Sequence, residues 1–340
     1  MSTLEPGEKI KPNIDIDSAE KLVDKLFNFK VIKIIEIDSY DDRNYLIEIE
    51  SDFHDHGKKF VLKITNSLDS SFPRLIEAVN EITNYVKSST SLKVPYPIPD
   101  CNGQLVSRIS LNSSLPEEQF AIRLLNFVPG TIMNQVDYTE NILFQVGETL
   151  ATLTKELKNF TNSVLEKRKT IWSLSSVDKL DKFLFAVDND DHRSLISGVI
   201  KKFKQQVIDK IDEFPVSIIH GDVNEQNIVL DKVDTNRWSV IGLIDFADSH
   251  QAPTIFDLAI LCCYVTLDSK LIDPIKAPGY VISGYHRVIQ ISDQEWNILP
   301  ISIMARLAQS LTLGAYSYRE NQGNEYILSS ARRAGQFWKD

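Results

Sequence analysis

The sequence predicts an α+β protein with a small N-terminal lobe built on an antiparallel sheet and a larger, mostly helical C-terminal lobe. Up to residue 126, short β-branched runs separated by polar turns surround one helical stripe. From residue 127 onward, apolar residues recur at helical spacing and only short apolar runs interrupt them. We therefore expect one lobe at residues 1–126 and a helical lobe at residues 127–340.

The N-terminal lobe begins with a short predicted helix and a meander of strands. Asp17 followed by Glu20 is a capping-box pattern, and apolar residues then recur at helical spacing up to Phe27. Polar turn clusters separate three β-like runs, which predicts antiparallel neighbours. The three strands are expected at residues 31–37, 45–49 and 60–64.

One helix and two further strands complete the predicted N-terminal lobe. Apolar side chains mark one helix face from Leu75 to Val86, and the Pro-rich residues 95–99 exclude a continuation of that helix. The two strands are expected at residues 104–107 and 120–127.

The C-terminal lobe is predicted from two long helical stripes, over residues 143–157 and 195–211. After Ala252 the pattern is again helical, and Ser292 with Glu295 forms another capping-box pattern. Three short apolar strands are expected before Ala252, at residues 216–219, 228–230 and 240–244.

The composition is that of an ordinary folded protein, with 43% hydrophobic and 25% charged residues in 340. The net charge of −10 and the absence of a Lys/Arg block argue against a nucleic-acid partner. Three cysteines are too few and too poorly spaced for a disulfide framework or a zinc site. Because we find neither a leader pattern nor an apolar stretch of membrane-spanning length, we expect cytoplasmic residence and no membrane association.

The strongest functional signal is a set of three oxygen-bearing side chains next to two apolar strands. Asp222 follows the strand at residues 216–219, Asn227 comes five residues later, and Asp245 follows the strand at residues 240–244. Taken alone, His220-Gly221-Asp222 is equally typical of an ordinary turn. Together, however, Asp222 can accept the proton of an attacking hydroxyl while Asn227 and Asp245 hold Mg²⁺. The set therefore favours a small-molecule kinase that uses a nucleotide donor.

Lys63 is a candidate for binding the donor phosphates, because it interrupts the apolar strand at residues 60–64. Glu77 and Glu81 lie one turn apart on the following helix, and we favour Glu77 as the carboxylate that holds Lys63 in place. A lysine at a sheet edge that faces solvent would be explained without any such role.

The loop at residues 38–44 joins the first two strands, where Ser39 or Arg43 could contact phosphate. It contains no glycine, and a polar hairpin turn explains these residues equally well.

Two residues are candidates for supporting the loop that carries Asp222. Asp257 begins an apolar helix downstream of Asp245, where a buried carboxylate could accept backbone N–H bonds from the loop. An acid at a helix start would also be favourable without that role. His220 opens the same loop.

These motifs resemble the aminoglycoside phosphotransferase and choline kinase superfamily, whose fold is similar to that of the protein kinases. The residues that carry this resemblance are 60–64, 220–227, 244–248 and 256–259. Further segments resemble the hydroxylysine kinases within that superfamily and extend the match over nearly the whole chain. These segments are residues 39–44, 75–77, 123–130, 310–311 and 315–317.

The resemblance implies a two-lobed, protein-kinase-like fold and transfer of a γ-phosphate to the side-chain hydroxyl of 5-hydroxy-L-lysine. GTP is the donor in the hydroxylysine kinases, with ATP as the alternative. Lys63 with Glu77 would then clamp the phosphates, and Leu125 and Phe127 would lie in the segment that reads the purine through backbone groups. Ala247 stands where protein kinases carry glycine, and no activation segment follows, which argues against a protein substrate.

Two alternatives stay open from the sequence. Within the same fold the acceptor could be choline, an aminoglycoside, homoserine or methylthioribose, because the shape of the pocket selects the acceptor. The chain could also be a catalytically inactive, kinase-like binding protein. The presence of Asp222, Asn227 and Asp245 together with Lys63 argues against an inactive protein.

Overall fold

The computed structural model describes residues 3–53, 56–112, 117–235 and 237–320. By its internal contacts the chain divides into two compact units. We call Glu8–Asn84 with Val94–Val128 the sheet unit, and Met1–Gly7, Tyr85–Lys93 and Pro129–Asp340 the helical unit. The boundary expected after residue 126 stays a prediction, and the contacts also assign residues 1–7 and 85–93 to the helical unit.

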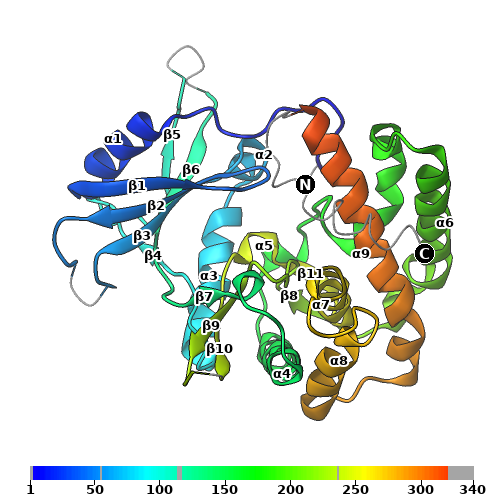
Figure 1. The fold of residues 1–340 in the computed structure, drawn as a ribbon. Helices are drawn as coiled ribbons and strands as arrows, with labels where there is room; N and C mark the ends of the chain where they lie inside the picture. The colour runs from blue at the N-terminus through cyan, green and yellow to red at the C-terminus, as the bar shows by residue number, and fades with distance from the viewer. Residues whose placement is uncertain (1–2, 54–55, 113–116, 236, 321–340) are drawn as a thin grey trace. The chain divides into compact units, whose positions relative to one another are not determined.

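The sheet unit holds a six-stranded antiparallel sheet in the order β1-β2-β3-β6-β4, with β5 also paired to β6 (Figure 1). Its last helix, α3, continues into the helical unit after residue 84. The elements are α1 (Ile16–Phe27), β1 (Val31–Ile37), β2 (Arg43–Ile49), β3 (Lys59–Ile64), α2 (Ser67–Ser71), α3 (Leu75–Ser89), β4 (Pro97–Ile98), β5 (Ser107–Ile109) and β6 (Phe120–Asn126).

The core of the sheet unit lies between α1 and one face of this sheet. Val23 and Phe27 of α1 pack in one cluster with alternate residues of β2 and β3, such as Ile47 and Leu62. Because successive strand residues face opposite sides, Lys63 belongs to the other face of the sheet. The alternation of β3 therefore accounts for a lysine inside an apolar run.

Two expectations for this unit are wrong in detail. Asp15, not Asp17, is the N-cap of α1, and its side chain accepts the Ser18 N–H at 2.8 Å. The strand expected at residues 104–107 begins only at Ser107, because Asp100 holds the preceding residues in a turn. Both differences come from short Asp side chains that bond to nearby backbone N–H groups.

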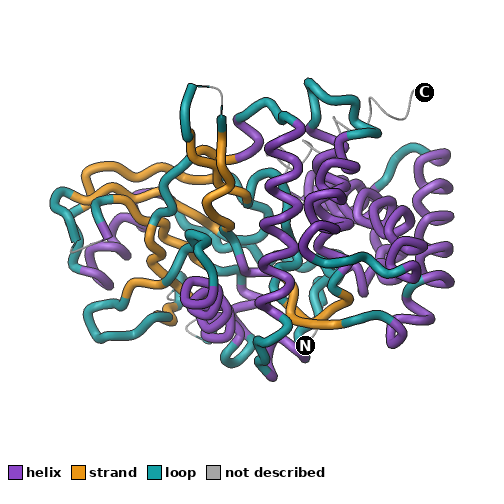
Figure 2. The backbone as a smooth tube through the Cα atoms, turned by 90° about the horizontal axis from the view of Figure 1, so that it is seen from below, coloured by secondary structure: helices purple, strands orange, loops and turns teal. Residues whose placement is uncertain are grey.

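Among the described residues, the helical unit combines helices with a three-stranded sheet, β10-β9-β7, and a two-stranded sheet, β11-β8, whose strands are labelled in Figure 1. Figure 2 distinguishes helices, strands and loops by colour. Its helices are α4 (Glu140–Leu157), α5 (Ser163–Glu166), α6 (Asp190–Gln206), α7 (Ile255–Asp268), α8 (Ala277–Val288) and α9 (Asp293–Glu320). Its strands are β7 (Thr131–Ile132), β8 (Val216–Ile219), β9 (Ile228–Lys232), β10 (Trp238–Leu243) and β11 (His250–Pro253), and its 3₁₀ segments include Leu174–Ala186 and Ile208–Glu213.

The capping box expected at Ser292 and Glu295 is confirmed. Glu295 Oε2 accepts the Ser292 N–H at 3.0 Å, and Ser292 Oγ accepts the Glu295 N–H at 3.3 Å. The stripe expected over residues 195–211 is not one helix, because the backbone leaves the helical region at Val207 (φ −123°, ψ −59°).

Helix α9 corrects the expectation that the chain has no stretch of membrane-spanning length and hydropathy. By length and composition, Asp293–Arg319 could cross a membrane. In the structure 67% of its most apolar window is buried inside the protein, where α9 contacts α6 and α7. A helix surrounded by other helices needs apolar side chains on most of its faces, and the core helix of a folded domain passes the same test.

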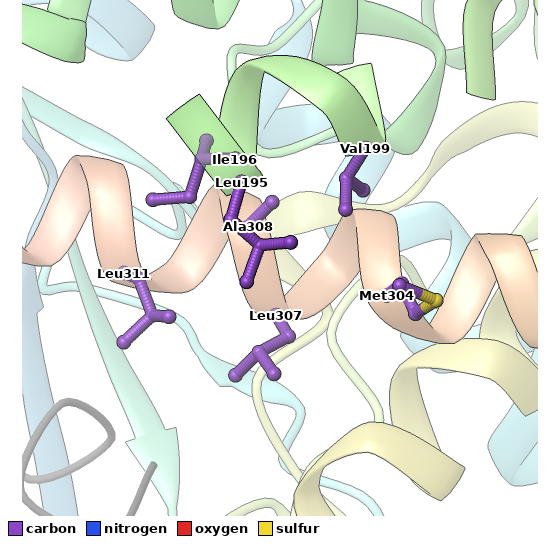
Figure 3. Close-up of a pocket in the computed structure, with 7 residues that line it drawn as sticks. All are labelled: Leu195, Ile196, Val199, Met304, Leu307, Ala308 and Leu311. Carbon is purple, nitrogen blue, oxygen red and sulfur yellow. The ribbon is translucent and has the colours of Figure 1, made fainter. Parts of the chain in front are cut away.

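An apolar pocket lies between α6 and α9 (Figure 3). Leu195 and Met304 at this pocket remain 51% and 45% exposed, respectively. Because none of its side chains can donate or accept a proton, we assign the pocket no part in the chemistry. Its lining residues are Leu195, Ile196, Val199, Met304, Leu307, Ala308 and Leu311.

Candidate active site

The loop with Asp222 begins where β8 ends, and its path depends on a glycine. Gly221 has φ +85°, and a Cβ there would lie 2.4 Å from the carbonyl oxygen of Asp248. Both the left-handed backbone and the close approach exclude a larger residue. Gly221 thus sets the turn that carries Asp222 out of β8.

The carboxylate of Asp222 is held from two sides. Its Oδ2 accepts hydrogen bonds from Nδ2 of Asn224 at 2.8 Å and Nδ2 of Asn227 at 3.0 Å. Its Oδ1 accepts a bond from Nη2 of Arg306 at 2.6 Å. The side chain is still 23% exposed, so a substrate can reach it.

Asn227 lies close to Asp222, as expected from a loop that curls back. Its Nδ2 donates to the backbone oxygen of Asp222 at 2.9 Å as well as to the carboxylate. Because both partners are acceptors, the amide nitrogen must face them, and the amide oxygen points elsewhere. The buried Asn227 therefore offers Oδ1 as an oxygen ligand.

Asp245 follows β10 in a left-handed conformation (φ 60°, ψ 69°), which is uncommon outside glycine and typical of functional turns. Its Oδ1 accepts the Ala247 N–H at 3.3 Å. The preceding residue, Ile244, donates its N–H to the backbone oxygen of Asn227 at 2.9 Å. The backbone thus brings the two candidate metal ligands into neighbouring segments.

The donor set fits a hard cation that keeps other oxygen ligands. The protein offers only one amide oxygen and one carboxylate here, which suits Mg²⁺ because phosphates and water usually fill its other coordination positions. Within the described ranges, no cluster of three His, Cys, Asp or Glu side chains could hold a metal by itself. Asn227 and Asp245 are therefore suited to a metal that arrives with a nucleotide.

Asp257 and His220 fix the loop, as the sequence suggested. The two carboxylate oxygens of Asp257 accept the backbone N–H groups of His220 and Gly221, each at 2.8 Å. Burial raises the pKa of Asp257 above its ordinary value of 3.8, although the charge of His220 and both backbone bonds oppose that shift. His220 itself lies 3.0 Å from the backbone oxygen of Ile244 through Nε2, which ties the loop to the end of β10.

In the sheet unit, the buried Lys63 pairs with Asp42, with Nζ 3.1 Å from Oδ2. Glu77, expected to hold Lys63, instead has Oε1 3.5 Å from Nη2 of Arg108, while its buried Oε2 has no hydrogen-bond partner among the residues that the structure describes. The observed ion pairs, Lys63 with Asp42 and Glu77 with Arg108, thus differ from the expected pair of Lys63 with Glu77. The role of Lys63 and Glu77 at the phosphates stays a prediction.

The other candidates in the sheet unit have local partners. Ser39 Oγ donates to the backbone oxygen of Asp42 at 2.5 Å, and Arg43 bonds to Pro12 and Glu36. Leu125 lies in β6, and the Phe127 N–H donates to the Lys59 oxygen at 3.3 Å. These contacts hold the loop before β2 and the end of β6 in place. A role of the four residues in nucleotide binding stays a prediction.

Two buried arginines of the helical unit were missed by the sequence reading. Arg306 contacts Asp222, and Arg168 donates to the backbone oxygens of Ala247 and Ser249, on the segment after Asp245. A signal existed for Arg306, because it is the single charged residue between Glu295 and Arg319. A charge in so apolar a run requires a partner.

A model of the phosphotransferase enzyme family matches residues 33–288 of the chain. The chain belongs to this family. It is therefore a phosphotransferase, and its acceptor is an alcohol group. The matched residues include both candidate metal ligands, the candidate base and Lys63.

Curated relatives of this phosphotransferase cover nearly its whole length. A hydroxylysine kinase of Xenopus laevis is 32% identical over 338 residues, which is 97% of this chain and 89% of the relative. A hydroxylysine kinase of Mus musculus is 30% identical, again over 97% of this chain and 89% of the relative.

Solved structures of distant kinases share the fold. An amicoumacin kinase in complex with AMP-PNP, Ca²⁺ and Ami has a TM-score of 0.70 at 15% identity and covers 94% of this chain and 92% of its own. A microcompartment-associated aminopropanol kinase has a TM-score of 0.69 at 14% identity, with 94% and 95% covered. The expected two-lobed, protein-kinase-like α+β fold is thereby confirmed.

Proposed function

We propose that this phosphotransferase transfers the γ-phosphate of a nucleoside triphosphate, GTP by resemblance, to the side-chain hydroxyl of 5-hydroxy-L-lysine. The observation that carries the proposal is the identity of about one residue in three with hydroxylysine kinases over 97% of the chain. The candidate base and both candidate metal ligands lie on two neighbouring segments of the helical unit, which supports an active enzyme.

Asp222 is the proposed general base, and its contacts select the oxygen that reacts. Within the described chain, Oδ2 accepts bonds from two amide groups, whereas Oδ1 accepts one bond, from Arg306. A carboxylate oxygen offers two lone-pair positions, so the position left open is on Oδ1. The acceptor hydroxyl would give its proton to Oδ1 as its oxygen bonds to the γ-phosphorus and the bond to the bridging oxygen breaks.

Asn227 and Asp245 are the proposed ligands of a divalent cation, Mg²⁺ by resemblance. When bound, the cation supplies positive charge that offsets the charge of the donor phosphates. Lys63 is proposed to contact the same phosphates. Since Lys63 now pairs with Asp42, phosphate binding would exchange one anionic partner for another.

The sheet unit is proposed to contact the remainder of the nucleotide. Ser39 lies in the loop before β2 and Arg43 is the first residue of that strand, where phosphate contacts are expected by resemblance. Leu125 and Phe127 lie at the end of β6, where backbone groups would read the purine. The Phe127 N–H already donates to the backbone oxygen of Lys59. This hydrogen bond must therefore break if the Phe127 N–H is to donate to a purine base.

The test is a transfer assay with purified protein, Mg²⁺ and 5-hydroxy-L-lysine, with GTP or ATP as donor. Phosphorylated product is read by mass spectrometry, and choline, homoserine and an aminoglycoside are run in parallel. We expect product from hydroxylysine, with GTP preferred. Product from another acceptor, with none from hydroxylysine, would show that the acceptor is wrong while the kinase activity holds.

The variant Asp222→Asn serves as the control for the assigned base. We expect its kcat to fall by about 100-fold or more, because a positioned base contributes on that order, while nucleotide binding stays close to wild type. Near-normal turnover in this variant would remove Asp222 from the mechanism.

A further inference from the structure

Arg306 is held almost rigidly beside the proposed base. Its side chain, on α9, is only 2% exposed. Nη2 donates to Asp222 Oδ1 at 2.6 Å, while Nη1 donates to the backbone oxygen of Trp172 at 3.0 Å and to Gln309 Oε1 at 2.9 Å. The guanidinium group therefore has fixed partners on both of its terminal nitrogens.

The surroundings of Arg306 are themselves fixed. Its guanidinium carbon lies 5.4 Å from the ring centroid of Trp172 and 5.4 Å from that of Tyr264, within the range of a cation–π contact. Gln309, one turn further along α9, donates through Nε2 to the backbone oxygens of Ile171 and Ser173 at 2.8 and 3.0 Å. Arg306 thus has little freedom to take another orientation.

Packing alone does not account for an arginine at this position. Burying a charge is costly, and a well-packed apolar side chain in its place is often neutral or stabilising. Gln309 already ties α9 to the segment at residues 171–173 with two hydrogen bonds. An apolar residue would lose the bonds of Nη1 to Trp172 and Gln309 as well as the bond of Nη2 to Asp222. Of these three partners, Asp222 is the one with a proposed part in the reaction.

We propose that Arg306 is a positioning residue for phosphoryl transfer. Through Nη2 it fixes Oδ1 of Asp222, the oxygen with the open lone-pair position, toward the acceptor hydroxyl. The amide groups of Asn224 and Asn227 hold the other oxygen, so the carboxylate cannot rotate. The proposal rests on the proposed function, because it assigns Arg306 a part in the reaction of the same base.

The first test compares Arg306→Met with the wild-type protein in the transfer assay. Methionine can fill the space between the two rings but cannot bond to Asp222. We expect kcat to fall by about 100-fold, as a displaced catalytic group typically costs, with the KM for nucleotide within about threefold of wild type. Arg287→Met removes an exposed arginine that pairs with Glu148 on the same unit, and it should leave kcat unchanged.

A double-mutant cycle separates positioning from a general structural role. If Arg306 acts through Asp222, Arg306→Met should lower turnover no further in the Asp222→Asn background. If Arg306→Met instead lowered turnover by the same factor in the wild-type and the Asp222→Asn backgrounds, the proposal would be overturned. So would a kcat for Arg306→Met within about threefold of wild type, with the fold confirmed by its melting temperature.

Two further measurements cover the cases in which Arg306→Met does not fold or the wild-type protein transfers no phosphate to hydroxylysine. If Arg306→Met does not fold, Arg306→Lys and Gln309→Met replace it. Each of these variants loosens the contact between Arg306 and Asp222 without removing the positive charge. An unchanged kcat in both would overturn the proposal. Phosphate release to water is read in the same samples, because it requires no particular acceptor. A wild-type protein that neither transfers nor hydrolyses would overturn the proposed function, and the role of Arg306 with it.

Discussion

At the residue scale, the site is organised by a few buried polar side chains that bond to backbone groups. Asp257 is the clearest case, because each of its oxygens accepts one of two consecutive N–H groups at 2.8 Å. An anionic acceptor can satisfy both donors, whereas a side-chain amide can satisfy one and places its own N–H groups against the other. The loop with Asp222 therefore depends on a carboxyl group that takes no part in the reaction itself.

We expect Asp257→Asn to lower the free energy of unfolding by about 1–3 kcal/mol, because one buried backbone N–H loses its acceptor. Turnover should fall as well, since the loop that carries Asp222 loses its support. Urea denaturation and steady-state kinetics measure the two effects. Wild-type stability and turnover in this variant would contradict the assigned role.

His250 predicts a pH dependence of stability. Burial lowers its pKa from 6.5 to about 4, and its Nε2 has no hydrogen-bond partner in the described chain. The unfolded state therefore binds a proton between pH 6.5 and 4 that the folded state excludes. The stabilisation is complete above pH 6.5 and is lost as the pH falls toward 4, by up to about 3 kcal/mol.

The measurement is urea denaturation of the wild type and His250→Gln at several pH values from 7 to 4.5. Since glutamine does not titrate, the stability of the wild type relative to the variant should decline as the pH falls. A difference that is constant with pH would show that His250 titrates normally in the folded protein.

At the element scale, two glycines allow α4 and α8 to cross closely. A Cβ at Gly147 would lie 2.0 Å from the backbone oxygen of Val281, and one at Gly284 would lie 2.0 Å from that of Phe144. Each helix thus places a glycine against the backbone of the other. The short strands nearby, which lead into the catalytic loop, pack on α4.

We expect Gly147→Ala to destabilise the protein by about 1–3 kcal/mol, because the added methyl group must push the two backbones apart. Gly198→Ala on α6 is a matched control, since none of the described residues comes within 4 Å of a Cβ at that exposed helical glycine. Alanine there should stabilise by about 0.5–1 kcal/mol through better helix propensity. Thermal unfolding should therefore show a lower melting temperature for Gly147→Ala and a higher one for Gly198→Ala. A lower melting temperature in both variants would point to a general effect of glycine replacement.

At the scale of the whole molecule, the proposed function predicts that ligands stabilise the folded protein. Nucleoside triphosphate with Mg²⁺ at about 100 times its Kd should add about 2.7 kcal/mol to stability. Removing the metal with EDTA should abolish most of the rise in melting temperature. Asp245→Asn should reduce it as well, because it weakens one of two proposed protein ligands. An unchanged rise for this variant would contradict a metal role for Asp245.

The sequence by itself determined the pattern of the elements and the main chemical residues. Alternation in β3 and helical stripes such as that of α4 are local periodicities, so they predicted the α+β, two-lobed fold, which the distant kinase structures confirm. Local spacing likewise selected Asp222 and Asn227, and the loop does bring these two side chains into contact. Such features depend on neighbours in the chain, which a sequence displays directly.

Only the tertiary structure decided which charged groups meet. Arg306 is 84 residues from Asp222 in the chain, and Lys63 in β3 pairs with Asp42 in the loop before β2 instead of with Glu77. Lys63 was selected because it interrupts an apolar strand, whereas Arg306, which interrupts an apolar run in the same way, was not selected. A buried charge takes whichever opposite charge or acceptor the packing brings within reach, and packing is a property of the folded chain.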